Sequence, residues 1–276
     1  LHPQRQVERV GGHDLVIFGP VLRRAAVDVD RTGIAQWRDE LGQHIVVAGH
    51  VQAALGGAFL ALFRDDANGV RAVAQGVQRA GSKSRAKLQP FAPLHLTWVG
   101  DGDLKRLRMM ETTQSAVLLA GEGLLCGLYA NELLTRALPV GLPAADVFAI
   151  YAWAIERLTR PAERATSLRR LEITLLETLD AEPIFLDLED RPLDPATHYT
   201  YLPDNRRFMP IAAQQPGWDG RSLKLLARGD WDVPGLAGLS KALTRAALAP
   251  LIGNQPLRSR ELMQRLNQRR RQGSDT

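Results

Sequence analysis

Residues 94–99 read Leu-His-Leu-Thr-Trp-Val, an alternation of apolar and polar side chains that is typical of a β-strand with one buried face. Three further strand-like runs precede it, at residues 45–47, 58–63 and 70–74. Turn formers separate these runs, as Asp-Asp-Ala-Asn-Gly at 65–69 and Gly-Asp-Gly-Asp at 100–103. Several short strands at this spacing predict a small β-barrel over residues 44–110, with the OB-fold as one candidate.

Beyond residue 110 the apolar side chains recur at helical spacing instead. Three segments carry this pattern, at residues 118–134, 147–158 and 168–179, and prolines mark the breaks, at Pro139, Pro143, Pro161 and Pro183. Residues 187–219 are acidic, contain proline and lack a period, so we expect an irregular or short-stranded insert there. The helical pattern returns at Ser222. The fold class predicted is therefore α+β, an N-terminal OB-fold β-barrel followed by a mainly α-helical domain over 111–266 that holds the insert.

The two ends of the chain are harder to interpret. Residues 1–43 show only one short strand-like run, at 14–18, and are left unassigned. Residues 267–276 are basic and are expected to form a disordered tail.

Charge is distributed unevenly along the 276 residues, whose formal net charge is +5. From Arg64 to Arg108 nine Lys or Arg face four Asp, a balance of 9 − 4 = +5, and from Arg258 to Thr276 six Arg face two acids, a balance of 6 − 2 = +4. Two basic regions around an acidic middle favour a polyanion partner, although solvated charge explains them equally well. The single cysteine, Cys126, lies in an apolar helical run, where we expect a small core residue and a reducing cytoplasm. The chain has no apolar run long enough for a membrane span and no signal-peptide pattern, so a soluble, intracellular protein is expected.

A glycine-rich stretch at residues 76–84 resembles a phosphate-binding loop but departs from it in one position. Ser82 stands where the loop needs its lysine, directly after Gly81, so we expect no ATP site. The basic residues of this stretch and its continuation suit DNA phosphates better, because loops on a rigid barrel often carry binding function. They are Arg79, Lys83, Arg85 and Lys87. The alternative is a solvated loop.

Catalytic and metal-binding patterns are weak throughout. His44 and His50 lack the partners of a zinc site, and the acidic cluster between Asp187 and Asp194 lacks the spacing of a calcium loop. No Gly-x-Ser-x-Gly turn occurs, and Cys126 lies in a run expected to be buried. We therefore predict no catalytic residue, no metal, no cofactor and no enzymatic activity.

Four stretches, in order, resemble the RecO family of bacterial recombination mediators. They are residues 59–77 continuing through 88–94 to the turn at 102–105, Gly-Leu-Tyr-Ala-Asn-Glu-Leu-Leu at 127–134, Leu-Arg-Arg-Leu-Glu at 168–172, and Leu-Ile-Gly-Asn-Gln-Pro-Leu-Arg-Ser-Arg-Glu-Leu at 251–262. Together they cover about residues 58–266. The resemblance implies an N-terminal OB-fold and a C-terminal helical domain, in agreement with the strand-then-helix pattern. Some members carry a four-cysteine zinc module in the insert, whereas residues 187–201 hold no cysteine, so the chain resembles the metal-free branch.

The resemblance also implies a function and partners. It implies binding of single- and double-stranded DNA, annealing of complementary strands, contact with RecR, indirect action on RecA, and capture of the acidic C-terminal tail of the single-strand-binding protein SSB. The DNA-binding residues expected are Arg71, Arg79, Lys83, Arg85, Lys87, Lys105, Arg106 and Arg108. The tail-binding residues expected are Arg169, Arg170, Arg258 and Arg260, although the i, i+3 spacing of Arg169 and Glu172 also allows a structural salt bridge.

One departure from the family concerns residues 1–57, which do not match its usual aromatic and basic opening strand. Residues 44–50 could supply that strand instead. Two other functions stay open from the residues alone, an RNA-binding OB-fold protein and a phosphate-ester enzyme that uses the acidic insert. Annealing of SSB-coated strands distinguishes the mediator from both.

Overall fold

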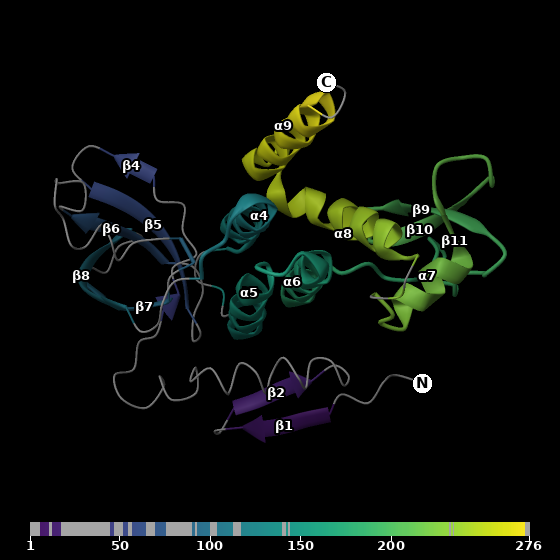
Figure 1. Cartoon of the computed structure of the whole chain (residues 1–276). Helices are drawn as coiled ribbons and strands as arrows, with labels where there is room; N and C mark the ends of the chain where they lie inside the picture. The colour runs from purple at the N-terminus through teal and green to yellow at the C-terminus, as the bar shows by residue number, and fades with distance from the viewer. Residues whose placement is uncertain are drawn as a thin grey trace. The chain divides into compact units, whose positions relative to one another are not determined.

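The structure is a computed structural model of the whole chain (Figure 1). It describes residues 6–10, 13–17, 45–46, 52–54, 57–64, 70–75, 90–91, 93–99, 104–112, 117–139, 142, 144–231, 233 and 235–273. The chain divides into two compact units. The strand unit is Leu1–Leu118 with Val140–Arg157, and the helical unit is Leu119–Pro139 with Leu158–Thr276. Each unit is described by itself.

The strand unit holds a six-stranded sheet and a separate hairpin. The sheet strands are β3 (Ile45–Val46), β4 (Gln52–Ala54), β5 (Gly57–Arg64), β6 (Val70–Gln75), β7 (Pro93–Val99) and β8 (Leu104–Thr112). Their order is β3-β7-β8-β6-β5-β4, and β3 also pairs with β5. The four strands predicted between residues 45 and 99 are therefore confirmed, and β3 shows that the segment around residue 45 does join the sheet. The hairpin pairs β1 (Gln6–Val10) with β2 (His13–Ile17), which confirms the strand-like run near residue 14.

Helix α5 (Ala145–Arg157) clusters with the strand unit rather than with the other helices. Its apolar face buries Val147, Phe148, Tyr151 and Ile155, at the i, i+4 spacing that predicted the helix. The Arg157 guanidinium lies 4.3 Å from the centre of the Trp153 ring.

The helical unit is built around α4 (Gly121–Ala137), α6 (Arg164–Thr178) and α8 (Ala237–Ile252). Leucines at helical spacing face one another in its core, which includes Leu133, Leu134, Leu171, Leu175, Leu243 and Leu248. A short 3₁₀ turn, η2 (Pro161–Glu163), begins at the predicted proline break and leads into α6. Helix α9 (Arg258–Gly273) packs against α4, and Figure 1 shows it leading away from the end of α8 to the C-terminus.

The predicted insert is an ordered small sheet. Strands β9 (His198–Leu202), β10 (Arg207–Ile211) and β11 (Trp218–Asp219) pair antiparallel in the order β10-β9-β11. Tyr199 and Tyr201 alternate inward on β9, and Phe185 stacks on Phe208 beneath them. Helix α7 (Gly220–Ala227) follows, with the Asp219 carboxylate accepting the Ser222 N–H as its N-terminal cap. The short-stranded alternative for the insert is thus the correct one.

The acidic residues of the insert are paired with arginines and with backbone groups. The Asp187 carboxylate accepts the N–H groups of Glu189 and Arg191 and the Nε–H of Arg191, and Asp190 pairs with Arg207. These contacts fold the loop into a closed turn.

The C-terminal end differs from the prediction. Helix α9 continues to Gly273, so the backbone of residues 267–273 is helical rather than disordered. The physical reason is that arginine, glutamine and leucine are good helix formers, and α9 starts from a fixed N-terminus on α4.

Candidate functional site

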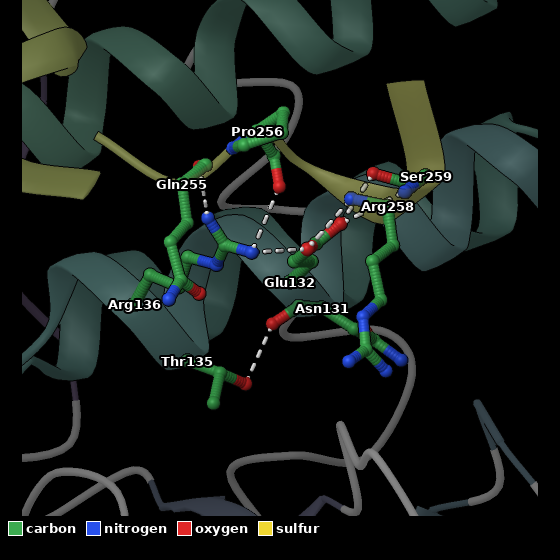
Figure 2. Close-up of polar contacts among 8 residues, drawn as sticks. All are labelled: Asn131, Glu132, Thr135, Arg136, Gln255, Pro256, Arg258 and Ser259. Carbon is green, nitrogen blue, oxygen red and sulfur yellow. Dashed lines mark hydrogen bonds and ion pairs between the residues drawn. The ribbon is translucent and has the colours of Figure 1, made fainter. Parts of the chain in front are cut away.

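A carboxylate of α4 holds the first turn of α9 (Figure 2). The Glu132 side chain accepts the backbone N–H of Arg258 (2.9 Å) and of Ser259 (2.9 Å), and also the Ser259 hydroxyl (2.7 Å). The first N–H groups of any helix have no partner inside the helix and need an outside acceptor. Glu132 supplies that acceptor from 126 and 127 residues away in the sequence.

Arg136, one turn after Glu132 on α4, holds the chain just before α9, and we call Glu132 and Arg136 together the clamp. Its guanidinium pairs with Glu132 (2.9 Å) and donates to the carbonyl oxygens of Gln255 (2.6 Å) and Pro256 (3.1 Å). Those carbonyls belong to the turn between α8 and α9, which begins at Gly253 with φ of 73°, a left-handed backbone that favours glycine. Two of the four family-like stretches, 127–134 and 251–262, therefore meet at this clamp.

The hydrogen bonds that Glu132 accepts favour the ionised form of its own carboxyl group. Burial raises the pKa of Glu132, but the hydrogen bonds from Ser259 and Arg258, together with the Arg136 charge, outweigh that effect, and the net pKa is lowered. The carboxylate is therefore charged near neutral pH, when it caps α9 best.

A buried polar network joins three helices of the helical unit, α4, α6 and α8. The Glu172 carboxylate on α6 accepts the Tyr129 hydroxyl of α4 (2.7 Å) and the Thr244 hydroxyl of α8 (2.6 Å). The Arg169 guanidinium pairs with Glu172 and donates to Thr244. Arg169 and Glu172 are only 7% and 2% exposed, so each needs the other as its countercharge. Burial lowers the pKa of Arg169 to about 10.

Arg260 extends this network toward the surface from α9. Its guanidinium carbon lies 5.3 Å from the centre of the Tyr129 ring, and its Nη2 donates to the Tyr129 hydroxyl (3.3 Å). The Arg260 Nε–H is buried and has no hydrogen-bond partner among the residues that the structure describes. Part of the donor capacity of this guanidinium is thus unused.

Two cations of α8 lie beside Arg260. Lys241 and Arg245 are exposed and one helical turn apart. Partial burial lowers the pKa of Lys241, and the charges of Arg245, Arg169 and Arg260 lower it further. Partial burial and then the charge of Arg260 lower the pKa of Arg245. We call Lys241, Arg245 and Arg260 the cation cluster, and its mutual repulsion makes it a place where an anion would bind favourably.

The four arginines predicted to bind the SSB tail differ in burial and in contacts. Arg169 is buried and engaged with Glu172, which is the structural salt bridge that its spacing also allowed, so it is not a surface contact. Arg260 belongs to the cation cluster, Arg258 is exposed, and Arg170 is half-buried on α6. Sequence reasoning missed Lys241 and Arg245, although their i, i+4 spacing in a predicted helical segment was a usable signal.

The predicted DNA-binding residues fall partly outside the described residues. Arg79, Lys83, Arg85 and Lys87 all lie there. The strand pairing sets Arg71 of β6 opposite Leu104 of β8, and Val73 opposite Arg106. Because alternate residues of a strand share a face, Arg71 and Arg106 lie on one face of the sheet and Lys105 on the other. Arg108 also lies on β8, at a shift of its register with β7.

The described residues offer neither a metal site nor a membrane-spanning helix. Within the described part of the chain, no group of three or more His, Cys, Asp or Glu side chains is placed to hold a metal ion. No described helix is both long and apolar enough to cross a membrane. Cys126 is half-buried rather than fully buried as predicted, and burial raises the pKa of its thiol, which favours the unreactive form.

Comparison with known proteins gives concordant matches. The family model described as "Recombination protein O N terminal" matches residues 60–116. A "DNA repair protein RecO" of Pseudomonas aeruginosa is 40% identical over 195 residues, which cover 70% of this chain and 82% of that protein. Proteins of the same name from Nitrosococcus oceani and Alteromonas mediterranea are 35% identical over 214 residues and 36% identical over 198 residues, covering 87% and 84% of their lengths.

Proposed function

Because the chain belongs to the RecO family of DNA repair proteins, we propose that it acts as a recombination mediator in the cytoplasm. In this role it binds single- and double-stranded DNA, anneals complementary strands and, with RecR, promotes RecA loading on SSB-coated DNA. It does so without covalent catalysis, ATP or a metal ion. The family membership supports the repair role, and the cation cluster supports a site for the partner's tail.

The strand unit is proposed to be the OB-fold that binds DNA. Support comes from the strand pairing, which runs from β3 through β7, β8, β6 and β5 and returns to β3. A five-stranded ring of this kind is what an OB-fold barrel requires. The proposed phosphate contacts are Arg71 and Arg106, on one face of this sheet, together with the basic residues Arg79, Lys83, Arg85 and Lys87.

The acidic SSB tail is proposed to bind at the cation cluster, and the observation that carries this proposal is the crowding of Lys241, Arg245 and Arg260. The charges of Arg245 and Arg260 help to lower the pKa of Lys241, and the charge of Arg260 helps to lower that of Arg245, so a carboxylate-bearing peptide would relieve this repulsion. Arg260 is the suited anchor, because the Tyr129 ring holds its guanidinium while its Nε–H is left without a partner. The half-buried Arg170 is kept as a helper, and Arg169 is left out because it is buried.

These two sites together suggest a mechanism. Annealing is opposed by repulsion between two phosphate backbones, and cationic surfaces reduce that repulsion while they hold both strands. A tail bound at the cation cluster would keep the protein on SSB-coated DNA, so strands would meet where SSB has already exposed them. The protein would therefore have two independent anion sites, one for phosphates and one for carboxylates.

Direct titration tests this proposal. The full-length protein would be titrated with a fluorescent acidic peptide that ends in a free carboxylate, and separately with labelled single-stranded DNA and with RNA of the same sequence. Binding of both the peptide and the DNA is expected. Binding of RNA alone would instead favour an RNA-binding OB-fold protein. Absence of peptide binding would show that the cation cluster is not a site for an acidic tail.

A further inference from the structure

We infer that the outward side of α9 is a second DNA-binding surface, which holds a phosphate backbone by a row of arginines. This inference rests on the proposed DNA-binding function and adds to it a surface on the helical unit. We call this surface the α9 outer face, and its described members are Arg258, Leu262, Arg265 and Leu266, all exposed.

The inward side of α9 is identified by its contacts with α4. Ser259 is only 4% exposed and is held by Glu132, while Arg260 lies on the Tyr129 ring and Met263 is half-buried. Residues two positions apart on a helix are separated by about 200° around its axis. Arg258 therefore lies on the opposite side from Arg260, and Figure 2 shows its side chain leading away from Glu132.

The arginines of the outer face form a row along the helix axis. Arg265 is seven residues after Arg258, which returns it to within about 20° of the same line. By the same geometry the backbone position of Arg269, four residues further, also falls near this line. Arg258 and Arg269 are eleven residues apart, so the row extends about 16.5 Å along the helix axis and does not form a compact pocket.

The charge of α9 favours a polyanion. The helix holds six Arg and one Glu, a balance of 6 − 1 = +5 over 16 residues. Among the described residues, neither the Arg258 nor the Arg265 side chain takes part in any of the salt bridges found. The exposed neighbours Gln264 and Gln268 add uncharged amide donors.

A nucleic-acid backbone fits this face better than an acidic peptide tail does. Protein contacts to phosphate and sugar come mainly from arginine and lysine, with help from side chains such as glutamine, and they follow the strand without reading its sequence. A short tail that ends in a carboxylate suits a compact cluster such as Lys241, Arg245 and Arg260. The two faces of α9 thus suit two different partners, with Arg260 toward the tail and Arg258 and Arg265 toward DNA.

The contacts of Glu132 and Arg136 attach the start of α9 to α4. Glu132 and Arg136 fix the first turn and the preceding turn of chain on α4. DNA held by the outer face would therefore be held by the whole helical unit. Because the strand unit is proposed to bind DNA as well, one molecule would have two separate DNA-binding surfaces.

The test compares two triple variants of the full chain. The outer-face variant carries Arg258→Gln, Arg265→Gln and Arg269→Gln, which keeps good helix formers while removing three charges. The matched control carries Arg221→Gln, Lys224→Gln and Arg228→Gln around α7, which removes the same net charge from the same unit. Binding of labelled single-stranded DNA and duplex would be measured over a salt series, with thermal unfolding and acidic-peptide binding in parallel.

The outer-face variant is expected to bind DNA about tenfold or more weakly than the control at low salt, whatever the base sequence. The slope of log affinity against log salt should flatten by about 2 on single strands and about 3 on duplex, since each lost phosphate contact contributes about 0.7 or 0.9. Peptide affinity should stay within about twofold of the parent.

Four results would overturn the inference. An equal loss in the control would show that only net charge matters, and unchanged DNA binding with weaker peptide binding would assign the face to a protein partner. If the parent binds and anneals DNA and the outer-face variant binds DNA equally well, α9 is not a DNA-binding surface, but the proposed function still holds. A parent that binds no DNA would overturn both the inference and the proposed function. If the triple variant failed to fold, the single exposed change Arg265→Gln would decide, with a slope change of about 0.7 expected on single strands.

Discussion

The Glu132 carboxylate on α4 accepts both the backbone N–H and the hydroxyl of Ser259, at 2.9 Å and 2.7 Å, and so caps the helix that carries Arg260 of the cation cluster. The fixed position of Arg260, the next residue, on the Tyr129 ring follows from this cap. Loss of the cap should therefore affect both the stability of the helical unit and the binding of acidic peptides.

The first prediction is that Glu132→Gln destabilises the protein by about 1 kcal/mol, within the range of about 0.5–2 kcal/mol for loss of a helix cap. The amide keeps the shape of the side chain but loses the charge and turns one acceptor into a donor. Urea unfolding at pH 7 would measure it, with Asp230→Asn, the loss of an exposed carboxylate, as a control expected to stay within about 0.5 kcal/mol.

The stability that Glu132 contributes should also depend on pH. Its folded pKa is lowered, so its contribution is fully present above the unfolded pKa of 4.5 and is lost as pH falls from there through the folded value. The difference in unfolding free energy between parent and Glu132→Gln should therefore shrink when unfolding is repeated at decreasing pH below about 4.5. A difference that grows on acidification would contradict the cap.

A second prediction concerns Arg169, which the structure assigns to the buried network. Arg169→Met should cost about 3–5 kcal/mol of stability, because it leaves the Glu172 carboxylate buried without its countercharge. Replacing both partners, as Arg169→Met with Glu172→Leu, should recover most of that loss. Thermal or urea unfolding of the two single variants and the double variant gives the coupling, and additive losses would mean that the two side chains do not form a pair.

The secondary structure was largely predictable, because local patterns determine it. Alternation at 94–99 gave β7, and leucine spacing at 168–179 gave α6. The alternating Tyr199 and Tyr201 carried the same signal inside the insert, but the surrounding acidic and proline residues obscured it.

The candidate site was predictable only in part. Arg260 came from a family-like stretch, but its neighbours Lys241 and Arg245 belong to no motif and join it only through the packing of α8 against α4. The pairing of Glu132 with Ser259 spans 127 residues, and no local pattern predicts such a contact. Burial decides between two roles of an arginine, which is why spacing alone could not separate the structural Arg169 from the surface Arg258.

A third prediction tests the cation cluster. Lys241→Gln with Arg245→Gln should weaken binding of an acidic, carboxylate-ended peptide by about tenfold or more, because charge-assisted hydrogen bonds are lost. Affinity for naked DNA should change by less than about threefold. Calorimetric or fluorescence titration of the peptide, with Arg221→Gln and Arg228→Gln as the equal-charge control, gives the answer. An unchanged peptide affinity would move the tail site elsewhere.

A fourth prediction tests the basic residues expected to bind DNA between residues 79 and 87. Replacing Arg79, Lys83, Arg85 and Lys87 with Ser should flatten the salt slope of single-strand binding by roughly 3, at about 0.7 for each phosphate contact. Folding should survive, since charged loop side chains are rarely part of a core. A variant that unfolds at the parent's temperature and keeps the parent's slope would show that the loop is merely solvated.

We propose that this protein anneals strands that SSB covers, by using one anion site for DNA and another for the SSB tail. The most direct measurement is the annealing rate of complementary SSB-coated oligonucleotides, in buffer with EDTA and without ATP, for the parent and for Lys241→Gln with Arg245→Gln. The account predicts that the parent accelerates annealing under these conditions, and that the variant anneals naked strands normally but SSB-coated strands several-fold more slowly. A parent that fails to anneal SSB-coated strands, or that strictly requires ATP or a divalent ion, would contradict it.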